Sequence, residues 1–230
     1  MKRTLLIVSL ITLTATFSQA QQYSNKIKTM IYGEAGLNIA GYYQTTASEK
    51  TIALGTVQRP MLSLYLKVKY PTLVGFEAGV VVSQTGLKAK DKTAAMAIFG
   101  DTLSSKAVLN SAYGFIDAIY FFQLQGDDNS ISAGVGLYGG YTFNADRYIG
   151  SEKNKLNLND NNWNQFDMGL QMKTAYNWHD RISLGMIYRI GFVPILKTID
   201  ITGDPNNLRT SVFTLTAGLR LAQFITKQKD

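Results

Sequence analysis

Apolar and polar residues alternate along most of this chain, as in the stretch RPMLSLYLKVKY at residues 59–70. Four aliphatic residues there alternate with polar residues that include Lys67 and Lys69. Because successive side chains of a β-strand point to opposite faces, the pattern predicts a strand with one apolar and one polar face. Seven further segments repeat the pattern, at residues 30–43, 74–87, 109–122, 130–143, 166–178, 181–193 and 210–224.

The connections between these eight segments alternate in length. Short connections are expected at residues 71–73, 123–129 and 179–180, and long polar ones at residues 44–58, 88–108, 144–165 and 194–209. A tilted strand needs about 9–11 residues to cross the hydrocarbon of a bilayer, and an open sheet edge in lipid would leave amides unpaired. We therefore predict an all-β fold, an eight-stranded antiparallel up-and-down transmembrane β-barrel of the outer-membrane type. Its short turns and both termini would lie on the periplasmic side.

The polar face carries charges of both signs, which favours placing this face inside the barrel. Each Lys or Arg turned toward lipid near the midplane would cost about 2–4 kcal/mol. Several together would cost on the order of 10 kcal/mol, which is comparable to the net stability of a typical domain. The interior of an eight-stranded barrel is narrow enough for side chains to fill it. The predicted luminal charges are Glu34, Lys67, Lys69, Glu77, Asp117, Asp167, Lys173, Arg189 and Arg220.

The expected register places some of these charges in pairs. If the turn at residues 71–73 joins facing strand ends, Lys67 lies directly opposite Glu77 on the inward face. Closure of the first strand against the last would likewise bring Glu34 near Arg220. Buried charges are tolerated when they are paired and hydrogen-bonded, so we expect a polar lumen that is plugged by its own side chains.

Aromatic residues on the outward face gather near both ends of the predicted strands. Those near the short turns are Tyr70, Tyr120, Phe122, Tyr176 and Trp178. Those near the long loops are Tyr43, Tyr141, Phe143, Phe166 and Phe192. Two aromatic girdles are typical of membrane barrels. The alternative is that these residues only favour strand formation.

The first twenty residues are typical of a secretory signal peptide. The basic residues Lys2 and Arg3 precede an apolar run at residues 5–17 that is too short to span a membrane, and SQA at residues 18–20 offers a cleavage site. Cleavage after Ala20 would leave residues 21–230 as one barrel domain, and loss of the two basic residues would lower the net charge from +7 to +5. The chain has no cysteine, which excludes a disulfide framework and a lipoprotein anchor.

Seven segments of the sequence follow one another in a distinctive order. They are YGEAGLNIAGYY, LVGFEAGVVVSQTGLKAK, SAYGFIDAIYFFQ, ISAGVGLYGGY, FDMGLQMKTAY, ISLGMIYRIGF and SVFTLTAGLRLAQF. In this order they resemble the PorT-like outer-membrane β-barrel proteins of Bacteroidota, over nearly the whole mature chain. The chain departs from that family where DAIYF replaces a strand that usually contains proline. It also departs at Phe224, which falls on the inward phase and is followed by residues 225–230. The resemblance implies an eight-stranded, non-enzymatic barrel and supplies no substrate.

The candidate motifs for catalysis and cofactor binding lack the structural surroundings that these functions require. Gly134, Gly136 and Gly139 match a dinucleotide fingerprint in spacing, but they lie inside a predicted strand and precede no helix. We interpret these glycines as making room in the lumen. The single histidine, His179, lies in a short turn without a neighbouring serine, unlike the Ser–His pair that a lipid hydrolase needs. The luminal carboxylates are interpreted as counter-ions and not as acid–base catalysts.

Metal binding is not predicted either. With no cysteine and one histidine, the chain lacks the ligands of a zinc site. The loop at residues 154–167 is rich in oxygen ligands but lacks the spacing of an EF-hand. The segment KTAAMAIFG at residues 92–100 fits either a short helix or an irregular loop. We predict no cofactor.

The leading hypothesis is a small, non-enzymatic outer-membrane barrel with a structural or interaction role through its long extracellular loops. Its partners would be outer-membrane lipid and a membrane protein, and the modest, scattered charge argues against nucleic acid. A link to secretion or gliding machinery rests on family analogy alone. The alternatives are a narrow pore or small-solute transporter, a secreted lipocalin-like barrel with an apolar interior, and an outer-membrane hydrolase.

Overall fold

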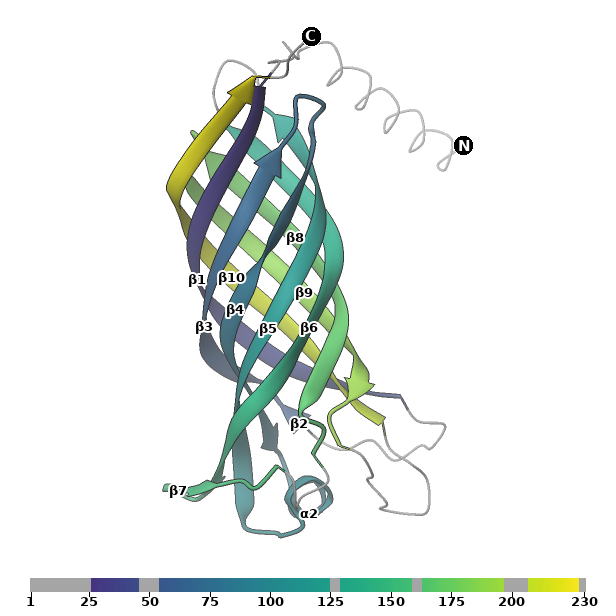
Figure 1. Cartoon of the computed structure of the whole chain (residues 1–230). Coiled ribbons are helices and arrows are strands. Elements are labelled where there is room, and N and C mark those ends of the chain that lie inside the picture. The colour runs from purple at the N-terminus through teal and green to yellow at the C-terminus, as the bar shows by residue number, and fades with distance from the viewer. Residues whose placement is uncertain (1–25, 46–53, 125–128, 159–162, 197–206, 228–230) are drawn as a thin grey trace, which may run out of the picture.

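The computed structural model describes residues 26–45, 54–124, 129–158, 163–196 and 207–227. The predicted signal peptide at residues 1–20 lies outside the described residues. Eight long antiparallel strands wind around one lumen (Figure 1). They are β1 (Lys26–Thr45), β3 (Val57–Lys69), β4 (Val74–Ala89), β5 (Ser104–Gln123), β6 (Ser130–Ile149), β8 (Phe166–Trp178), β9 (Ile182–Pro194) and β10 (Asn207–Lys227). The other described elements are β2 (Leu54–Gly55), β7 (Glu152–Lys155) and the helix α2 (Lys92–Phe99).

The ring of strands closes between the first strand and the last. β1 pairs with β10 along its whole length, from Lys26 opposite Lys227 to Thr45 opposite Asn207. Each of the other long strands pairs with its neighbours in the chain, and every pairing is antiparallel. A closed ring leaves no unpaired edge in the wall, as a sheet surrounded by hydrocarbon requires. The predicted eight-stranded up-and-down barrel is confirmed.

The alternation of side chains gives the barrel an apolar outer surface and a polar interior. Leu62 and Leu64 of β3 are 64% and 50% exposed, whereas Lys67 of the same strand is 1% exposed. Large exposed apolar side chains occur on all eight long strands. An apolar outer band around a polar lumen is typical of transmembrane β-barrels. It is the reverse of the apolar interior that a lipocalin-like barrel requires.

The turn between β8 and β9 is tight and has an unusual backbone. His179 and Asp180 both have left-handed conformations, with φ of 50° and 51°. Positive φ at both central residues is the mark of the two-residue type I′ hairpin turn. The Arg181 N–H donates to the Trp178 carbonyl at 2.8 Å and closes the turn. The predicted short connection between these strands is confirmed.

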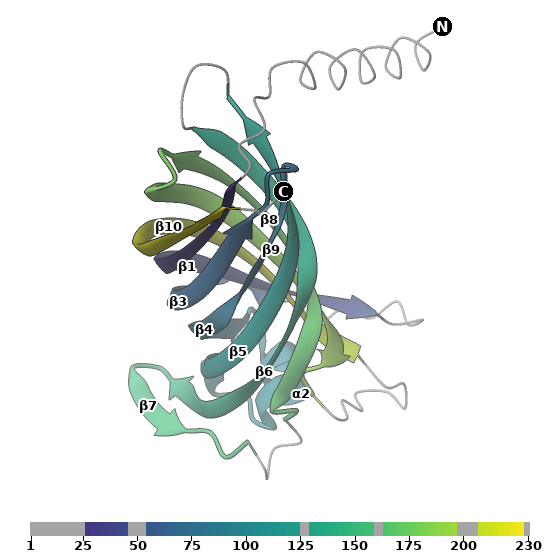
Figure 2. The ribbon, with the colours of Figure 1, turned by 45° about the horizontal axis from the view of Figure 1, so that its top comes forward.

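At the other end of the barrel, several strands run past their predicted limits, β5 and β6 by the most. β4 ends at Ala89, β5 begins at Ser104 and β6 continues to Ile149. Parts of all four predicted long loops, at residues 44–58, 88–108, 144–165 and 194–209, are therefore strand, which corrects the sequence-based boundaries. β7 pairs with the end of β6, and this hairpin stands away from α2 (Figure 2).

The helix α2 occupies the segment whose conformation the sequence left open. The Asp91 carboxylate caps its start by accepting a hydrogen bond from the Ala94 N–H at 2.7 Å. Gly100, with a left-handed φ of 72°, ends it by donating its N–H to the Met96 carbonyl at 2.9 Å. Among the described residues, no helix is both long enough and apolar enough to cross a membrane.

A bulge in β10 changes the face of its last residues. Arg220 lies opposite Tyr32, but Ala222 lies opposite Ile31, so β10 contains one residue more than β1 between these pairs. The extra residue moves Phe224 from its predicted inward phase to the outer surface, where its side chain is 57% exposed. The prediction for Phe224 was wrong because counting in steps of two assumes an uninterrupted strand.

Candidate functional site

Buried charges from four strands cross the lumen. Lys67 on β3 lies opposite Glu77 on β4, as predicted, and the Lys67 Nζ atom is 2.9 Å from Glu77 Oε1. The Lys173 Nζ atom on β8 reaches across to Glu77 Oε2 at 3.0 Å and to Glu34 Oε1 on β1 at 3.5 Å. None of these four residues is more than 4% exposed. Two cations and two carboxylates therefore join opposite walls of the barrel.

Neutral polar groups complete this network. Lys67 donates to the Asn177 side-chain oxygen at 2.9 Å, and the Ser63 hydroxyl donates to Glu34 at 3.2 Å. Asp117, which is 1% exposed, accepts a hydrogen bond from Gln171 at 2.8 Å. Such bonds offset part of the cost of removing charges from water.

Aromatic rings fill the space beside the charges. Tyr32 and Tyr65 stack with their ring centroids 5.4 Å apart, and Phe115 packs against Tyr65 at 6.1 Å. The Lys67 Nζ atom lies 4.9 Å from the Tyr32 ring centre, and the Lys173 Nζ atom lies 4.1 Å from that of Tyr65. These cation–π contacts stabilise cations that have left water. Sequence reasoning missed these rings, although each one lies on the polar phase of its strand.

Arg189 is held by neutral groups. Its Nη2 atom donates to the Asn38 side-chain oxygen at 3.1 Å and to the Thr214 hydroxyl at 3.0 Å. The guanidinium carbon lies 4.5 Å from the centre of the Tyr113 ring. Within the described part of the chain, no carboxylate forms an ion pair with Arg189. This residue therefore closes a second level of the lumen through hydrogen bonds and ring packing.

The other predicted luminal charges lie toward the two ends of the barrel. Asp167 accepts hydrogen bonds from the hydroxyls of Tyr138 at 3.2 Å and Thr210 at 3.0 Å. Lys69 lies near the short turns, with its Nζ atom 3.8 Å from the Asp180 carboxylate. The luminal charges are thus spread along the barrel and do not form one cluster.

The predicted approach of Glu34 to Arg220 is wrong. Glu34 lies opposite Gly218 and forms its ion pair with Lys173 across the lumen. Arg220 donates a hydrogen bond to Gln223 near the end of β10. Arg220 is two residues further along β10 than Gly218, the residue opposite Glu34. Two residues of a strand span about 6–7 Å, so pairing of β1 with β10 does not by itself bring the two side chains into contact.

An apolar cluster, here called the cap, covers the lumen at the end where β4, β5 and β6 are extended. It joins α2 to the extended strands, to the segment before β8, to the segment after β9 and to the start of β10. Its buried members are Leu87, Ala89, Ala94, Ala95, Ile98, Phe99, Ala107, Leu109, Ala145, Leu156, Leu158, Trp163, Ile195, Leu196 and Leu208. Trp163 is 1% exposed and forms a backbone bridge with Leu196. The cap explains why the extended strands are ordered beyond the predicted barrel, because their inward side chains are buried in it.

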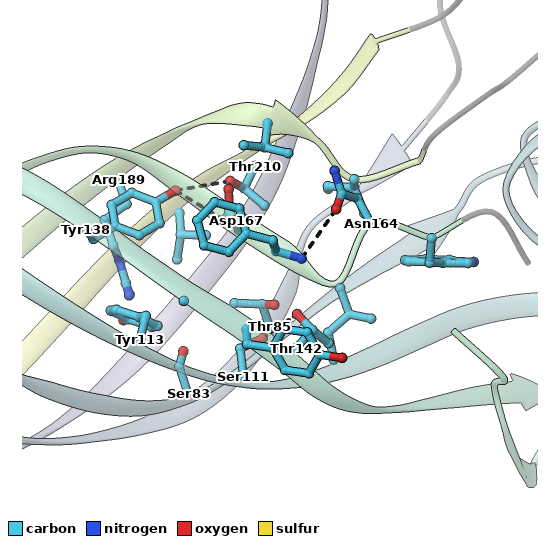
Figure 3. A pocket seen from close by; sticks show the side chains of 18 of the residues that line it. Ser83, Thr85, Ser111, Tyr113, Tyr138, Thr142, Asn164, Asp167, Arg189 and Thr210 are labelled. Atoms are coloured by element: carbon cyan, nitrogen blue, oxygen red, sulfur yellow. Dashed lines mark hydrogen bonds between the residues drawn. The ribbon is translucent and has the colours of Figure 1, made fainter. Parts of the chain in front are cut away.

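A small cavity lies beneath the cap (Figure 3). Tyr138, Asp167 and Thr210 line one side of it, and Tyr113 and Ser111 line the other. Its volume of about 50 Å³ would accommodate about three or four water molecules. Ligand sites for drug-sized molecules are typically about 300–1,000 Å³. The cavity is therefore a gap in a packed lumen and does not amount to a ligand site of that size.

The predicted exterior aromatic residues lie on the outer surface. Tyr70, Tyr120, Phe122, Tyr141, Phe143, Phe166, Tyr176, Trp178 and Phe192 are between 38% and 56% exposed. Tyr43 is half-buried, and its hydroxyl donates to the Gly191 carbonyl at 2.8 Å. Their positions near both strand ends match the arrangement that a bilayer favours for aromatic side chains.

The candidate motifs identified in the sequence have structural roles in the barrel. Gly134 and Gly136 lie within β6, and a side chain at Gly136 would meet the Ile116 carbonyl and the Asp117 carboxylate. His179 is a turn residue whose backbone N–H donates to the Asn129 side chain at 3.0 Å. No group of three or more acidic, histidine or cysteine side chains that could hold a metal ion occurs among the described residues. The loop at residues 154–167 includes residues 159–162, which lie outside that part.

Comparison with known proteins gives similarities of architecture alone. No family model and no curated protein matches the chain. Neisserial surface protein A has a TM-score of 0.42 at 14% identity, covering 86% of this chain and 98% of that one. OprG from Pseudomonas aeruginosa has a TM-score of 0.48 at 10% identity, covering 86% and 95%. Ail from Yersinia pestis, solved with the heparin analogue sucrose octasulfate, has a TM-score of 0.41 at 10% identity, covering 85% and 99%.

The class of the protein follows from its own strand pairing and side-chain orientation. A closed ring of eight antiparallel strands, with an apolar exterior and a charged interior, is the fold of an outer-membrane-type β-barrel. The distinguishing features of this barrel are its occluded lumen and the apolar cap at one end.

Proposed function

We propose that this chain is a closed, non-conducting barrel of the outer membrane with a non-enzymatic structural or interaction role. The cap would face the exterior, and the start of β1 and the end of β10 would face the periplasm. The observation that carries the proposal is the luminal network, in which Lys173 on β8 reaches across the lumen to Glu77 on β4 and to Glu34 on β1. Ion flow would require these buried ion pairs to separate in a medium of low dielectric constant, which is costly.

Occlusion at three successive levels supports the same proposal. The ion-pair network with its stacked tyrosines forms one level, Arg189 with Tyr113 forms the second, and the cap forms the third. A narrow pore, the rival function, would need a continuous watery path past all three. The cavity beneath the cap holds about 50 Å³ and lies between two of these levels.

Conductance in a planar bilayer tests the proposal. We expect the folded chain to give no unitary current steps at any applied voltage. The shift in gel mobility between unheated and boiled samples would show that the same preparation contains a folded barrel. Steady unitary current steps from the folded barrel would overturn the proposal in favour of the pore.

The cap offers a surface for an interaction partner. Met96 on α2 is 53% exposed and Leu103, beside the start of β5, is 70% exposed. Single apolar residues on a surface are common, but these two lie on the extension that projects beyond the barrel wall. We propose that this end contacts a second membrane protein. A role in secretion or gliding machinery is the finer form of this proposal and comes from the PorT-like resemblance.

Co-purification from the native membrane tests the interaction role. A partner that uses this surface should be recovered with the unmodified chain and lost from a Met96→Glu, Leu103→Glu variant. Ser151→Glu, at the exposed turn between β6 and β7, adds a charge elsewhere on the extension and should retain the partner. Equal recovery with all three proteins would rule out this surface as the contact.

A further inference from the structure

The barrel wall has uneven height, here called the step, at the end where β1 begins and β10 ends. β9 begins at Ile182, opposite Leu219, but β10 continues to Lys227. A backbone hydrogen bond follows this last pair, in which the Arg220 N–H donates to the Arg181 carbonyl at 2.8 Å. Beyond it, β10 pairs with β1 alone among the described strands, and Figure 1 shows the two ending side by side. β1 pairs with β3 as far as Lys28, so the turn between β8 and β9 is set back from the projecting ends of β1 and β10.

A pocket of about 620 Å³ occupies this step. Its volume falls in the usual range of ligand sites, about 300–1,000 Å³. One wall comes from the turn between β8 and β9, and the other comes from β1 and β10. The lining residues are Lys28, Trp178, His179, Asp180, Arg181, Ile182, Arg220 and Gln223.

The lining carries an excess of positive charge. Three cationic residues face one carboxylate, Asp180, which is 2.9 Å from the Lys28 Nζ atom and is also near Lys69. Arg181 and Arg220 form no ion pair with any residue that the structure describes. Guanidinium groups bind phosphate oxygens through paired hydrogen bonds, so two of them at one pocket favour a phosphate group as ligand.

Exposed apolar side chains occur in the pocket lining and beside its lining residues on β10. Trp178 is 51% exposed, and Leu221 and Phe224 on the projecting part of β10 are 59% and 57% exposed. Trp178 is one of the aromatic residues near the short turns, where the edge of the hydrocarbon is expected. A ligand with a phosphate and an attached acyl chain would contact both the cationic and the apolar residues. A free phosphate ion would contact only the cationic residues.

We propose that this pocket binds the phosphodiester headgroup of an anionic phospholipid in the leaflet that faces the periplasm. The phosphate lies between Arg181 and Arg220, and the acyl chains run along Trp178 and the exposed apolar residues of β10. This site rests on the membrane location proposed above. It would hold the turn between β8 and β9 against the projecting ends of β1 and β10.

Fluorescence quenching by brominated lipid tests the site directly. The chain has two tryptophans, so a Trp163→Phe variant leaves Trp178, which lines the pocket, as the reporter. The variant is folded into vesicles of equal parts phosphatidylglycerol and phosphatidylcholine, with one lipid or the other brominated. We expect a preference for phosphatidylglycerol of about fivefold for each cation that contacts it. Arg181→Gln with Arg220→Gln should bring the preference close to one.

A matched pair of charge removals at the other end provides the control. Lys88 and Lys106 lie opposite each other on β4 and β5. Lys88→Gln with Lys106→Gln removes the same charge far from the pocket and should leave the preference intact. An excess of inorganic phosphate should not change the preference. If phosphate abolishes it, the site binds the free ion and the lipid proposal fails.

The remaining outcomes separate the site from the membrane location. Equal quenching by both brominated lipids in the unmodified pocket would overturn the site while leaving the barrel in the bilayer. A preference that persists in the double arginine variant would also overturn it. No quenching by either lipid would mean that Trp178 does not face a bilayer, and it would overturn the location and the site together.

Discussion

Lys67 and Glu77 face each other in register across β3 and β4, with 2.9 Å between Nζ and Oε1 and side chains that are 2% and 0% exposed. A cation this deeply buried is tolerated because its partner is buried with it. The same carboxylate also receives Lys173 from the opposite wall, so one local pair supports a contact across the whole lumen.

Removing the Glu77 charge should destabilise the barrel strongly. Glu77→Gln would leave Lys67 and Lys173 without their shared carboxylate, and breaking a buried pair typically costs about 3–5 kcal/mol. The free energy of unfolding in urea, measured in lipid vesicles, checks this value. Glu152→Gln on the exposed strand β7 removes the same charge and should change stability by less than about 0.5 kcal/mol. Equal effects of both substitutions would contradict the luminal role of Glu77.

A charge on the outer wall should be costly in proportion to its depth. Leu64 is 50% exposed in the interior of β3, and we expect Leu64→Arg to cost about 2–4 kcal/mol in a bilayer. Gln58 is exposed near the start of β3, where the edge of the bilayer is expected, so Gln58→Arg should cost about 0–1 kcal/mol. Unfolding in vesicles compares the two. The assignment of the outer wall to lipid fails if the order is reversed or if both substitutions are harmless.

Asp180 should make stability depend on pH in the acid range. Burial of its carboxyl raises the pKa, but the charges of Lys69 and Lys28 outweigh burial and hold the pKa below its usual value. The ionised carboxylate therefore contributes stability that is complete above about pH 4 and is lost as the pH falls through the lower, folded-state pKa. The urea midpoint should drop in that window, and it should drop less in Asp180→Asn. Parallel pH curves for the two proteins would show that Asp180 contributes nothing.

The two tryptophans should respond to different quenchers. Trp163 in the cap is 1% exposed and Trp178 on the outer wall is 51% exposed. In a Trp178→Phe variant, we expect Trp163 emission to resist acrylamide because the cap excludes small polar molecules. In Trp163→Phe, emission from Trp178 should be quenched by brominated acyl chains. Acrylamide quenching of Trp163 as strong as that of free tryptophan would mean that the cap opens in solution.

Local alternation was sufficient to predict the wall of the barrel. Each strand's period of two sets which side chains share a face, and the cost of charges in lipid then decides which face points inward. The short turn after β3 sets the register with β4, so the pairing of Lys67 with Glu77 follows from strand alternation and turn length together.

Contacts between distant parts of the chain could not be derived in the same way. The outward position of Phe224 depends on one extra residue in β10, and composition carries no sign of that bulge. The cap also escaped prediction, because most of its members lie in segments whose polar composition suggested loops.

The sequence alone determined eight strands, their apolar and polar faces and the closure of the lumen by charges, because these properties depend on neighbours within a strand or a turn. Only the tertiary structure decided that Glu34 pairs with Lys173, that α2 and Trp163 seal one end, and that a step exposes Arg181 and Arg220 at the other. Such contacts depend on how far each strand extends and how the ring closes, and both result from packing across the whole barrel.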